Sequence, residues 1–184
     1  MKHNSDEKDV LMFRALLAMV MIFLAAALRF APHPWNVTPV GAMALFAGAM
    51  FRDRRLAFAF PLLALFAGDC FIGFHRLMPI VYASFLVNVA IGLWLQNRRS
   101  AGKIGTAVFL GAIQFFVVTN FAFWAFGQFY PRTLAGLATC YIAGIPFFWN
   151  TLAGDAVYAA VLFGGFALAE MLVPAFREPA HVTR

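Results

Sequence analysis

The chain has 184 residues, of which 63% are apolar and 12% are charged, and its mean hydropathy is +0.80. A soluble domain usually carries about 25% charged residues, so this composition excludes a water-soluble globular protein and predicts an integral membrane protein. The net charge of +6 does not indicate a nucleic-acid partner. The cations flank apolar segments, where anionic lipid headgroups of the bilayer would meet them, and they form no basic stripe.

Six apolar segments predict an all-α bundle of six transmembrane helices. A helix needs roughly 20 apolar residues to cross the hydrocarbon core, with about 17 to 25 tolerated. In chain order the segments cover residues 10–30, 37–51, 56–74, 79–95, 104–126 and 151–173. The second is short, which predicts a tilted or partly buried helix. Its Ala44-x-x-x-Gly48 spacing permits close helix contact, with ordinary packing as the simpler interpretation.

The distribution of cations predicts the orientation of these segments, because Lys and Arg close to span ends are retained in the cytoplasm. Six crossings put both termini on one side. That side carries eleven of the cations, whereas the other carries only Arg29, Arg76 and Arg132. We therefore predict cytoplasmic termini, with residues 1–9 and 175–184 as cytoplasmic tails around a six-helix domain at residues 10–174.

The long connection at residues 127–150 lies on the side opposite the termini in this topology. It holds six aromatic residues and two prolines. Its length and composition favour a lid or a half-buried segment that folds back into the bundle. An interfacial aromatic belt is the alternative.

The third segment ends in a group of residues that could carry chemistry. Asp69 and Cys70 lie in its last turn, and His75 and Arg76 follow in the connection. An ionisable group at membrane depth costs about 2.5 to 3.5 kcal/mol on insertion scales, so it usually faces a cavity or a partner. Asp69 is therefore a candidate site residue, or else it pairs with Arg76 or Arg132 or bonds to nearby backbone.

The sixth segment carries a second polar stripe. Asn150, Asp155 and Tyr158 are spaced at about one helical turn. This spacing places Asp155 where it could meet the surroundings of Asp69 across the bundle. Asn150 also suits the N-cap of a helix that starts at Thr151.

Cys70 has two interpretations. A free cysteine in an apolar helix is usually a small inert hydrophobe. Its thiolate is also a soft ligand for a late transition metal that already has other ligands, such as the axial position of a macrocycle. A zinc site is excluded because four donors are wanted. Cys140 is the one possible disulfide partner, and we do not expect that pairing.

A further motif lies at residues 130–133. Tyr130-Pro131-Arg132-Thr133 is either a helix start or an anion contact presented to the outside. No P-loop, HExxH, nucleophile elbow or dinucleotide fingerprint is present, so the chain has no ATP site and none of the usual catalytic motifs.

Four stretches together resemble a known family. They are Pro-Trp-Asn-Val-Thr-Pro-Val-Gly-Ala at residues 34–42, Gly-Asp-Cys-Phe-Ile-Gly-Phe-His at 68–75, Tyr-Pro-Arg-Thr-Leu-Ala-Gly at 130–136 and Ile-Pro-Phe-Phe-Trp-Asn-Thr-Leu-Ala-Gly-Asp at 145–155. They resemble small six-helix membrane proteins related to the substrate-binding S components of energy-coupling-factor (ECF) vitamin transporters. Cys70, where such relatives carry leucine, is similar to the solitary cobalamin transporters of Gram-negative bacteria, the BtuM family.

This resemblance implies an S-component-like bundle in the bacterial inner membrane that takes up cobalamin, vitamin B12, from the extracytoplasmic side. It implies Cys70 as the axial thiolate ligand of the corrinoid cobalt, with possible thiol-assisted removal of the upper cyanide ligand. The predicted substrate-binding residues are Trp35, Asp69, Cys70, His75, Tyr82, Tyr130, Arg132, Asn150 and Asp155.

The first segment lacks the Ala-x-x-x-Ala spacing with which S components usually dock on a shared coupling protein. This absence favours a solitary protein without an ATPase module. The alternatives are a transporter of another vitamin or precursor with Cys70 incidental, a membrane enzyme, and a structural membrane protein that binds no ligand.

Overall fold

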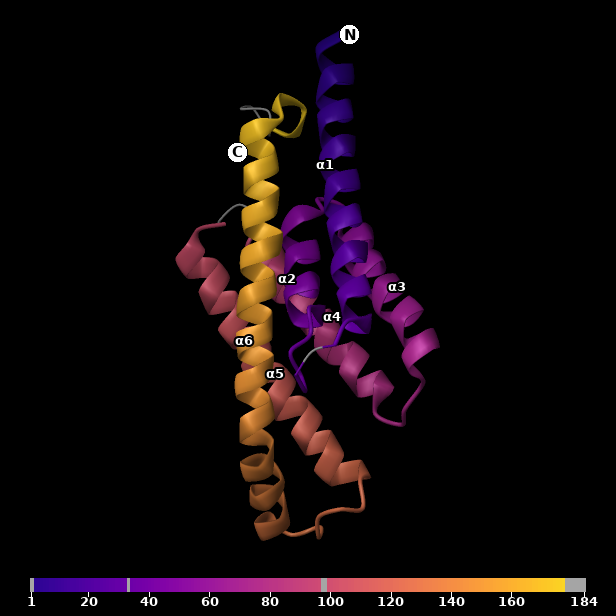
Figure 1. Cartoon of the computed structure of the whole chain (residues 1–184), viewed down its shortest axis with the longest axis vertical. Coiled ribbons are helices and arrows are strands. Elements are labelled where there is room, and N and C mark those ends of the chain that lie inside the picture. Colours follow the sequence, from indigo (N-terminus) through magenta and orange to yellow (C-terminus); the bar gives the residue numbers. More distant parts are fainter. Residues whose placement is uncertain (1, 33, 97–98, 178–184) are drawn as a thin grey trace.

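A computed structural model describes residues 2–32, 34–96 and 99–177, and they form an all-helical bundle (Figure 1). Its main helices are α1 (Lys2–Ala27), α2 (Val40–Met50), α3 (Arg54–Ile72), α4 (Met78–Trp94), α5 (Ala101–Phe126) and α6 (Leu134–Leu172). Two short 3-10 helices, η1 (Leu28–Phe30) and η2 (Pro174–Phe176), follow α1 and α6. The N-terminus and the end of α6 lie at the same end of the bundle, and the α5–α6 turn lies at the other.

The six predicted segments correspond to the six helices, with one large difference at α6. This helix starts at Leu134 and runs for 39 residues, roughly 58 Å at 1.5 Å per residue. The prediction of a lid at residues 127–150 is therefore wrong, because only residues 127–133 connect α5 to α6. Pro146 lies within α6. The aromatic residues of this stretch instead pack between helices, as where Phe116 contacts Tyr141 and Phe148.

The first and second segments also differ from their predicted bounds. Helix α1 begins at Lys2, so residues predicted as an N-terminal tail are helical. Residues 178–184 of the predicted C-terminal tail lie outside the described residues. Helix α2 has only 11 residues, roughly 16 Å, which is about half the thickness of a hydrocarbon core.

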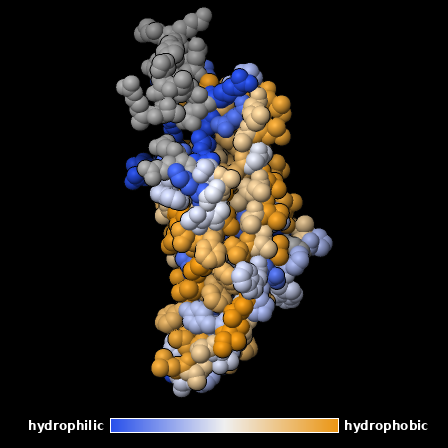
Figure 2. Space-filling view, turned by 90° about the vertical axis from the view of Figure 1, so that its left-hand side faces the viewer, coloured by the Kyte–Doolittle hydropathy of each residue, from blue (hydrophilic) through white to orange (hydrophobic). Residues whose placement is uncertain are grey.

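The described helices have the character of a helical membrane protein. Four stretches are long and apolar enough to cross a membrane: Lys8–Phe30, Arg54–Ile72, Ala101–Phe126 and Leu134–Leu172. Figure 2 shows hydrophobic side chains over the middle of one face, with hydrophilic residues gathered at the end where the termini lie. An apolar belt of this kind suits a lipid environment.

Helix α2 is the centre of the bundle. Ten of its residues are buried, and α1, α3, α4, α5 and α6 all contact it. It crosses α4 closely: a Cβ atom on Gly48 would lie 2.1 Å from the carbonyl oxygen of Val89, and one on Gly92 would lie 2.2 Å from that of Leu45. The two glycines therefore allow the backbones to touch, which is the close contact that the Ala44-x-x-x-Gly48 spacing permits.

The arrangement of the ends leads to a topology test. We expect a reporter fused after Arg184 to be cytoplasmic and one inserted in residues 127–133 to be extracytoplasmic, because the cations concentrate at the terminal end. Alkaline phosphatase and green fluorescent protein fusions measure this directly. A periplasmic C-terminus would contradict the orientation and reverse the two sides of the protein.

The α2–α4 crossing gives a second prediction. Gly48→Val should destabilise the protein by about 1 to 3 kcal/mol or prevent folding, because the added atoms meet the α4 backbone, which can move only with the helix. Gly164→Val is the matched control, since a Cβ atom there meets nothing within 4 Å. Thermal melting in detergent, followed by size-exclusion chromatography, compares the two variants. Equal melting temperatures would mean that the crossing is looser than described.

Candidate functional site

A cavity of about 530 Å³ opens between the helices at the start of α2. Its walls come from η1, the connection before α2, and helices α2 to α6. The polar and charged side chains that line it include Arg29, Trp35, Asp69, His75, Asn88 and Asp155. Apolar walls are supplied by Leu65, Ile72, Val81, Phe85 and Phe115. The cavity therefore combines a largely apolar wall with a few convergent polar groups, as small-molecule sites do.

The first polar group is an ion pair between Arg29 and Asp69. Arg29 Nη2 lies 2.8 Å from Asp69 Oδ1, and the two side chains are only 13% and 9% exposed. Tyr82 donates its hydroxyl to the other carboxylate oxygen, Oδ2, at 2.7 Å. Both carboxylate oxygens thus have a partner, which a charge in this setting requires.

The local sequence makes this pair possible. Arg29 lies in η1, where the chain leaves α1, and its Nη1 also donates to the carbonyl of Leu65 at 3.3 Å. A Cβ atom on Gly68 would lie 2.8 Å from that same Nη1, so glycine leaves the room that the guanidinium needs over α3. The predicted partners of Asp69, Arg76 and Arg132, are wrong: Arg29 is the partner, and η1 supplies it.

The second polar group is Asp155, which is 2% exposed. Its Oδ1 accepts the backbone N–H of Ala42 at 2.9 Å. Ala42 is the third residue of α2, so the carboxylate of α6 meets the positive end of a helix that starts inside the bundle. A Cβ atom on Gly41 would lie 2.3 Å from Asp155 Oδ2, which shows how closely the carboxylate approaches the α2 backbone. Asp69 and Asp155 line one cavity, as the expected meeting of the two polar stripes requires.

The connection before α2 is held over the cavity by α6. Asn36 has a φ of 64°, and Val37 donates its N–H to Pro34 at 3.1 Å, which makes a tight turn. Asn150 donates to the carbonyl of Trp35 at 2.9 Å. Its predicted N-cap role is wrong, because α6 is already helical there, and its amide instead fixes this turn. The Trp35 side chain is 81% exposed at the edge of the cavity.

A buried amide cluster was missed by sequence reasoning. Gln114 on α5 donates to the carbonyl of Ser84 at 2.9 Å and to Asn88 Oδ1 at 2.8 Å, both on α4. Ser84 and Asn88 are 2% and 1% exposed, and Asn88 also lines the cavity. Their four-residue spacing in an apolar segment puts them on one helix face, and this was the signal that could have identified them.

Cys70 lies outside this group. It is exposed, has no disulfide, and is not among the described residues that line the cavity. One turn before it on α3 lies Phe66, which packs on Phe74 in the connection that follows the helix. Cys140 is also free, and its thiol is buried against the carbonyl of Asn120 at 3.5 Å. Within the described ranges no three His, Cys, Asp or Glu residues gather as a metal site.

Arg132 and Tyr130 lie in the α5–α6 turn and do not line the cavity. Arg132 Nη2 donates to the carbonyl of Gly127 at 2.7 Å, and Nη1 donates to that of Trp124. The guanidinium therefore caps the C-terminal end of α5 and lies over the Trp124 ring at 5.9 Å. Thr133 is the N-cap of α6, and its hydroxyl accepts the N–H of Gly136 at 3.1 Å. The helix-start interpretation of this motif is the one that its geometry supports.

A family model matches residues 10–176, which include every helix that forms the cavity. The chain belongs to DUF6580, a family of unknown function. No curated protein and no solved structure matches it. The resemblance to S components and to cobalamin transporters therefore stays a prediction.

The ion pair gives a prediction that tests whether Arg29, rather than Arg76 or Arg132, is the partner of Asp69. Asp69→Leu should destabilise the protein by about 3 to 5 kcal/mol, because it leaves the Arg29 guanidinium buried without its carboxylate. The double variant Arg29→Met with Asp69→Leu should recover part of that loss. Arg76→Gln is the control and should melt like the parent protein, since Arg76 is exposed. If Arg76→Gln costs as much as Asp69→Leu, the assigned pairing is wrong.

Proposed function

We propose that this chain is a multi-pass protein of the bacterial inner membrane that takes up a vitamin-sized solute from the extracytoplasmic side. The observation that carries the proposal is the cavity of about 530 Å³ with Asp69 and Asp155 on its walls. Intramembrane carboxylates are costly and usually mark a ligand or ion pathway. The volume is within the range of about 300 to 1,000 Å³ found for small-molecule sites.

We propose that the cavity opens to the extracytoplasmic side. It lies at the start of α2, away from the end of the bundle that holds the start of α1 and the end of α6. The cation count favours a cytoplasmic position for that end. A ligand would enter past Trp35, whose exposed indole borders the opening. With no P-loop in the sequence, the protein binds its ligand without hydrolysing ATP itself, and we propose that it works as a solitary protein.

The ligand that we propose is a corrinoid, with the Cys70 thiolate as axial ligand of its cobalt. Cys70 is a free and exposed thiol, and it follows Asp69 directly in the chain. A corrinoid is larger than the cavity, so the macrocycle would lie across the opening, and only its peripheral groups would enter. Exposed aromatic side chains of the same region, among them Trp35 at 81% and Phe71 at 83%, offer surfaces for its faces.

Thiolate coordination would also change the chemistry of the bound vitamin. The sulfur donates an electron pair to cobalt and loses its proton to solvent, because the metal favours the thiolate. Strong donation from one face weakens the bond on the opposite face, so cyanide can leave with its electron pair as CN⁻. The cobalt keeps its oxidation state in this exchange. We propose ligand exchange of this kind as an accompaniment to uptake.

A second candidate is a transporter of another vitamin or precursor that lies wholly within the cavity. The position of Cys70 favours it, because the thiol is absent from the cavity lining while Asp69, His75 and Asp155 are part of it. In that case Cys70 is incidental, and the ligand contacts the carboxylates.

A visible spectrum of the purified protein tests the corrinoid proposal. Adding cyanocobalamin should shift its absorption bands, and Cys70→Ser should abolish the shift and lower affinity at least tenfold, because the soft donor is lost. Cys140→Ser is the matched control and should change neither, since its thiol is buried elsewhere. If Cys70→Ser keeps both the shifted bands and the affinity, thiolate ligation is wrong. If Cys70→Ser binds a colourless vitamin as tightly as the parent protein does, the second candidate is favoured.

A further inference from the structure

Asp155 lies on the turn of α6 where two cavities border on each other. Its own side chain lines the cavity of the candidate site. Leu152 and Ala156, on the same turn, line a second cavity of about 690 Å³ between α5 and α6. This second cavity, which we call the α5–α6 groove, extends to Arg99 and Glu170, near the end of α6. The two cavities thus approach this turn of α6 from opposite ends of the bundle (Figure 1).

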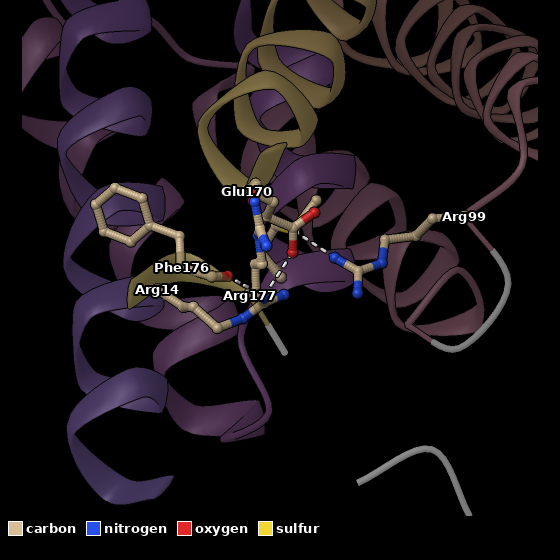
Figure 3. A network of polar contacts seen from close by, with 6 residues as sticks. Arg14, Arg99, Glu170, Phe176 and Arg177 are labelled. Atoms are coloured by element: carbon tan, nitrogen blue, oxygen red, sulfur yellow. Dashed lines mark hydrogen bonds and ion pairs between the residues drawn. The ribbon is translucent and has the colours of Figure 1, made fainter. Parts of the chain in front are cut away.

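The two carboxylates of α6 have different surroundings. Glu170 has arginine side chains around it (Figure 3), and its Oε1 lies 2.5 Å from Arg14 Nη1. Asp155 is 2% exposed, and among the described residues its hydrogen-bond partner is the backbone N–H of Ala42, which Oδ1 accepts at 2.9 Å. No ion pair to Asp155 occurs in the part of the chain that the structure describes. Its charge is therefore met by the start of α2, where a helix carries about half a positive charge, and by no described cation.

The neighbouring helices do not supply that cation. The charged or titratable side chains that line the cavity with Asp155, or lie within one turn of it on α6, are Arg29, Asp69, His75 and Tyr158. Arg29 is bonded to Asp69, and no described contact joins His75 to Asp155. Helix α2 has no titratable side chain, and α4 has only Tyr82, which donates to Asp69. On α5 the only one, Lys103, lies in the first turn, away from the cavity residue Phe115.

An unpaired carboxylate at membrane depth is costly, and such groups commonly serve as proton carriers in transporters. A proton is the smallest cation that removes the charge. An uptake protein without a P-loop also needs a source of energy other than its own ATP hydrolysis. The position of Asp155 between two cavities meets both needs, because a proton can reach this turn from one end of the bundle and leave toward the other.

We propose that Asp155 is the proton-binding group of this protein and that its proton accompanies the solute during uptake. A proton from water on the extracytoplasmic side binds Oδ2 and converts the carboxylate to the neutral acid, while Oδ1 keeps the N–H of Ala42. Loss of the charge weakens the attraction between Asp155 and the positive end of α2, so α6 can shift against α2. The acid then gives up the same proton on the side of the α5–α6 groove, and the carboxylate is restored. The coupling step rests on the proposed uptake function, whereas the proton site itself does not.

Infrared difference spectroscopy of the full chain in detergent tests the proton site without any ligand. When the pH falls from about 9 to about 5, a range in which ordinary aspartates stay ionised, the parent protein should gain the carbonyl band of a protonated carboxylic acid. Asp155→Asn should lose this band. Asparagine keeps the size and the oxygen that accepts the Ala42 N–H, so α2 stays capped, but it cannot take up the proton. His75 has no carboxyl group and cannot contribute to the band.

Asp53→Asn is the matched control. Asp53 is exposed and also accepts a backbone N–H at a helix start, that of Arg55 at 2.8 Å, so the substitution is the same in a similar role. This variant should keep the band. Asp155→Ser is a second variant without the carboxyl group, so that a folding defect in Asp155→Asn leaves the measurement informative.

Uptake of radiolabelled cyanocobalamin into proteoliposomes tests the coupling. With an alkaline interior, the parent protein should accumulate at least fivefold more label than at equal pH on both sides, and a protonophore should abolish the gain. Asp155→Asn should still bind cyanocobalamin but should gain nothing from the gradient.

Three results would overturn the proposal: a parent protein without the acid band, a band that persists in both Asp155 variants, or a gradient that stimulates Asp155→Asn as much as the parent. If the parent protein shows the band but takes up no cyanocobalamin at any gradient, the corrinoid proposal fails, whereas Asp155 stands as the proton-binding group.

Discussion

The structure depends on burying a short helix whose backbone ends lie inside the bundle. Helix α2 has 11 residues, and its first N–H groups and last carbonyls would be unsatisfied in an apolar setting, where each costs several kcal/mol. Side chains from outside the helix bond to these groups. Asp155 of α6 accepts from Ala42 at one end, and Gln96 donates to the carbonyls of Gly48 and Phe51 at the other, at 3.1 Å and 2.7 Å. The bundle is thus organised around a short helix whose backbone end groups bond to side chains of neighbouring segments.

The same constraint explains why the candidate site lies where it does. Helix α2 starts inside the bundle, so the connection from the end of α1 must enter the bundle to reach it. This connection forms one wall of the cavity. The charges then serve two purposes. Asp155 stabilises the start of α2, and the Arg29–Asp69 pair ties η1 to α3, so each carboxylate has a bonded partner while part of it borders the cavity. A ligand in this cavity would meet groups that are already held in place, which lowers the ordering cost of binding.

The sequence predicted the elements whose signal is local. Hydrophobic length identified six helical segments, and the cost of charge in apolar surroundings singled out Asp69 and Asp155. Two features depend on tertiary structure and were missed. Arg29 looked like an interfacial cation, because nothing local indicates that η1 brings it to α3. The start of α6 was misplaced because Pro146 and Asn150 suggested a connection. In a membrane, groups on neighbouring helices can bond to the backbone groups that a proline leaves unpaired, so a helix can continue through it.

Helix α6 contributes lining residues to both cavities, so a shift of this helix would change both of them. Asp155 projects from it into the polar cavity, while Leu152 and Ala156, its neighbours within one turn, line a second cavity, an apolar groove of about 690 Å³ between α5 and α6. The two cavities therefore border on each other along one turn of this helix, which is also the longest in the described chain at 39 residues. A displacement of α6 at its middle would therefore alter the contact between Asp155 and α2 and the width of the groove together. On α5 the two cavities are further apart, because the nearest lining residues, Phe109 and Phe115, are six residues or almost two turns apart. The shortest physical route between the two cavities thus runs through the turn of α6 around Asp155.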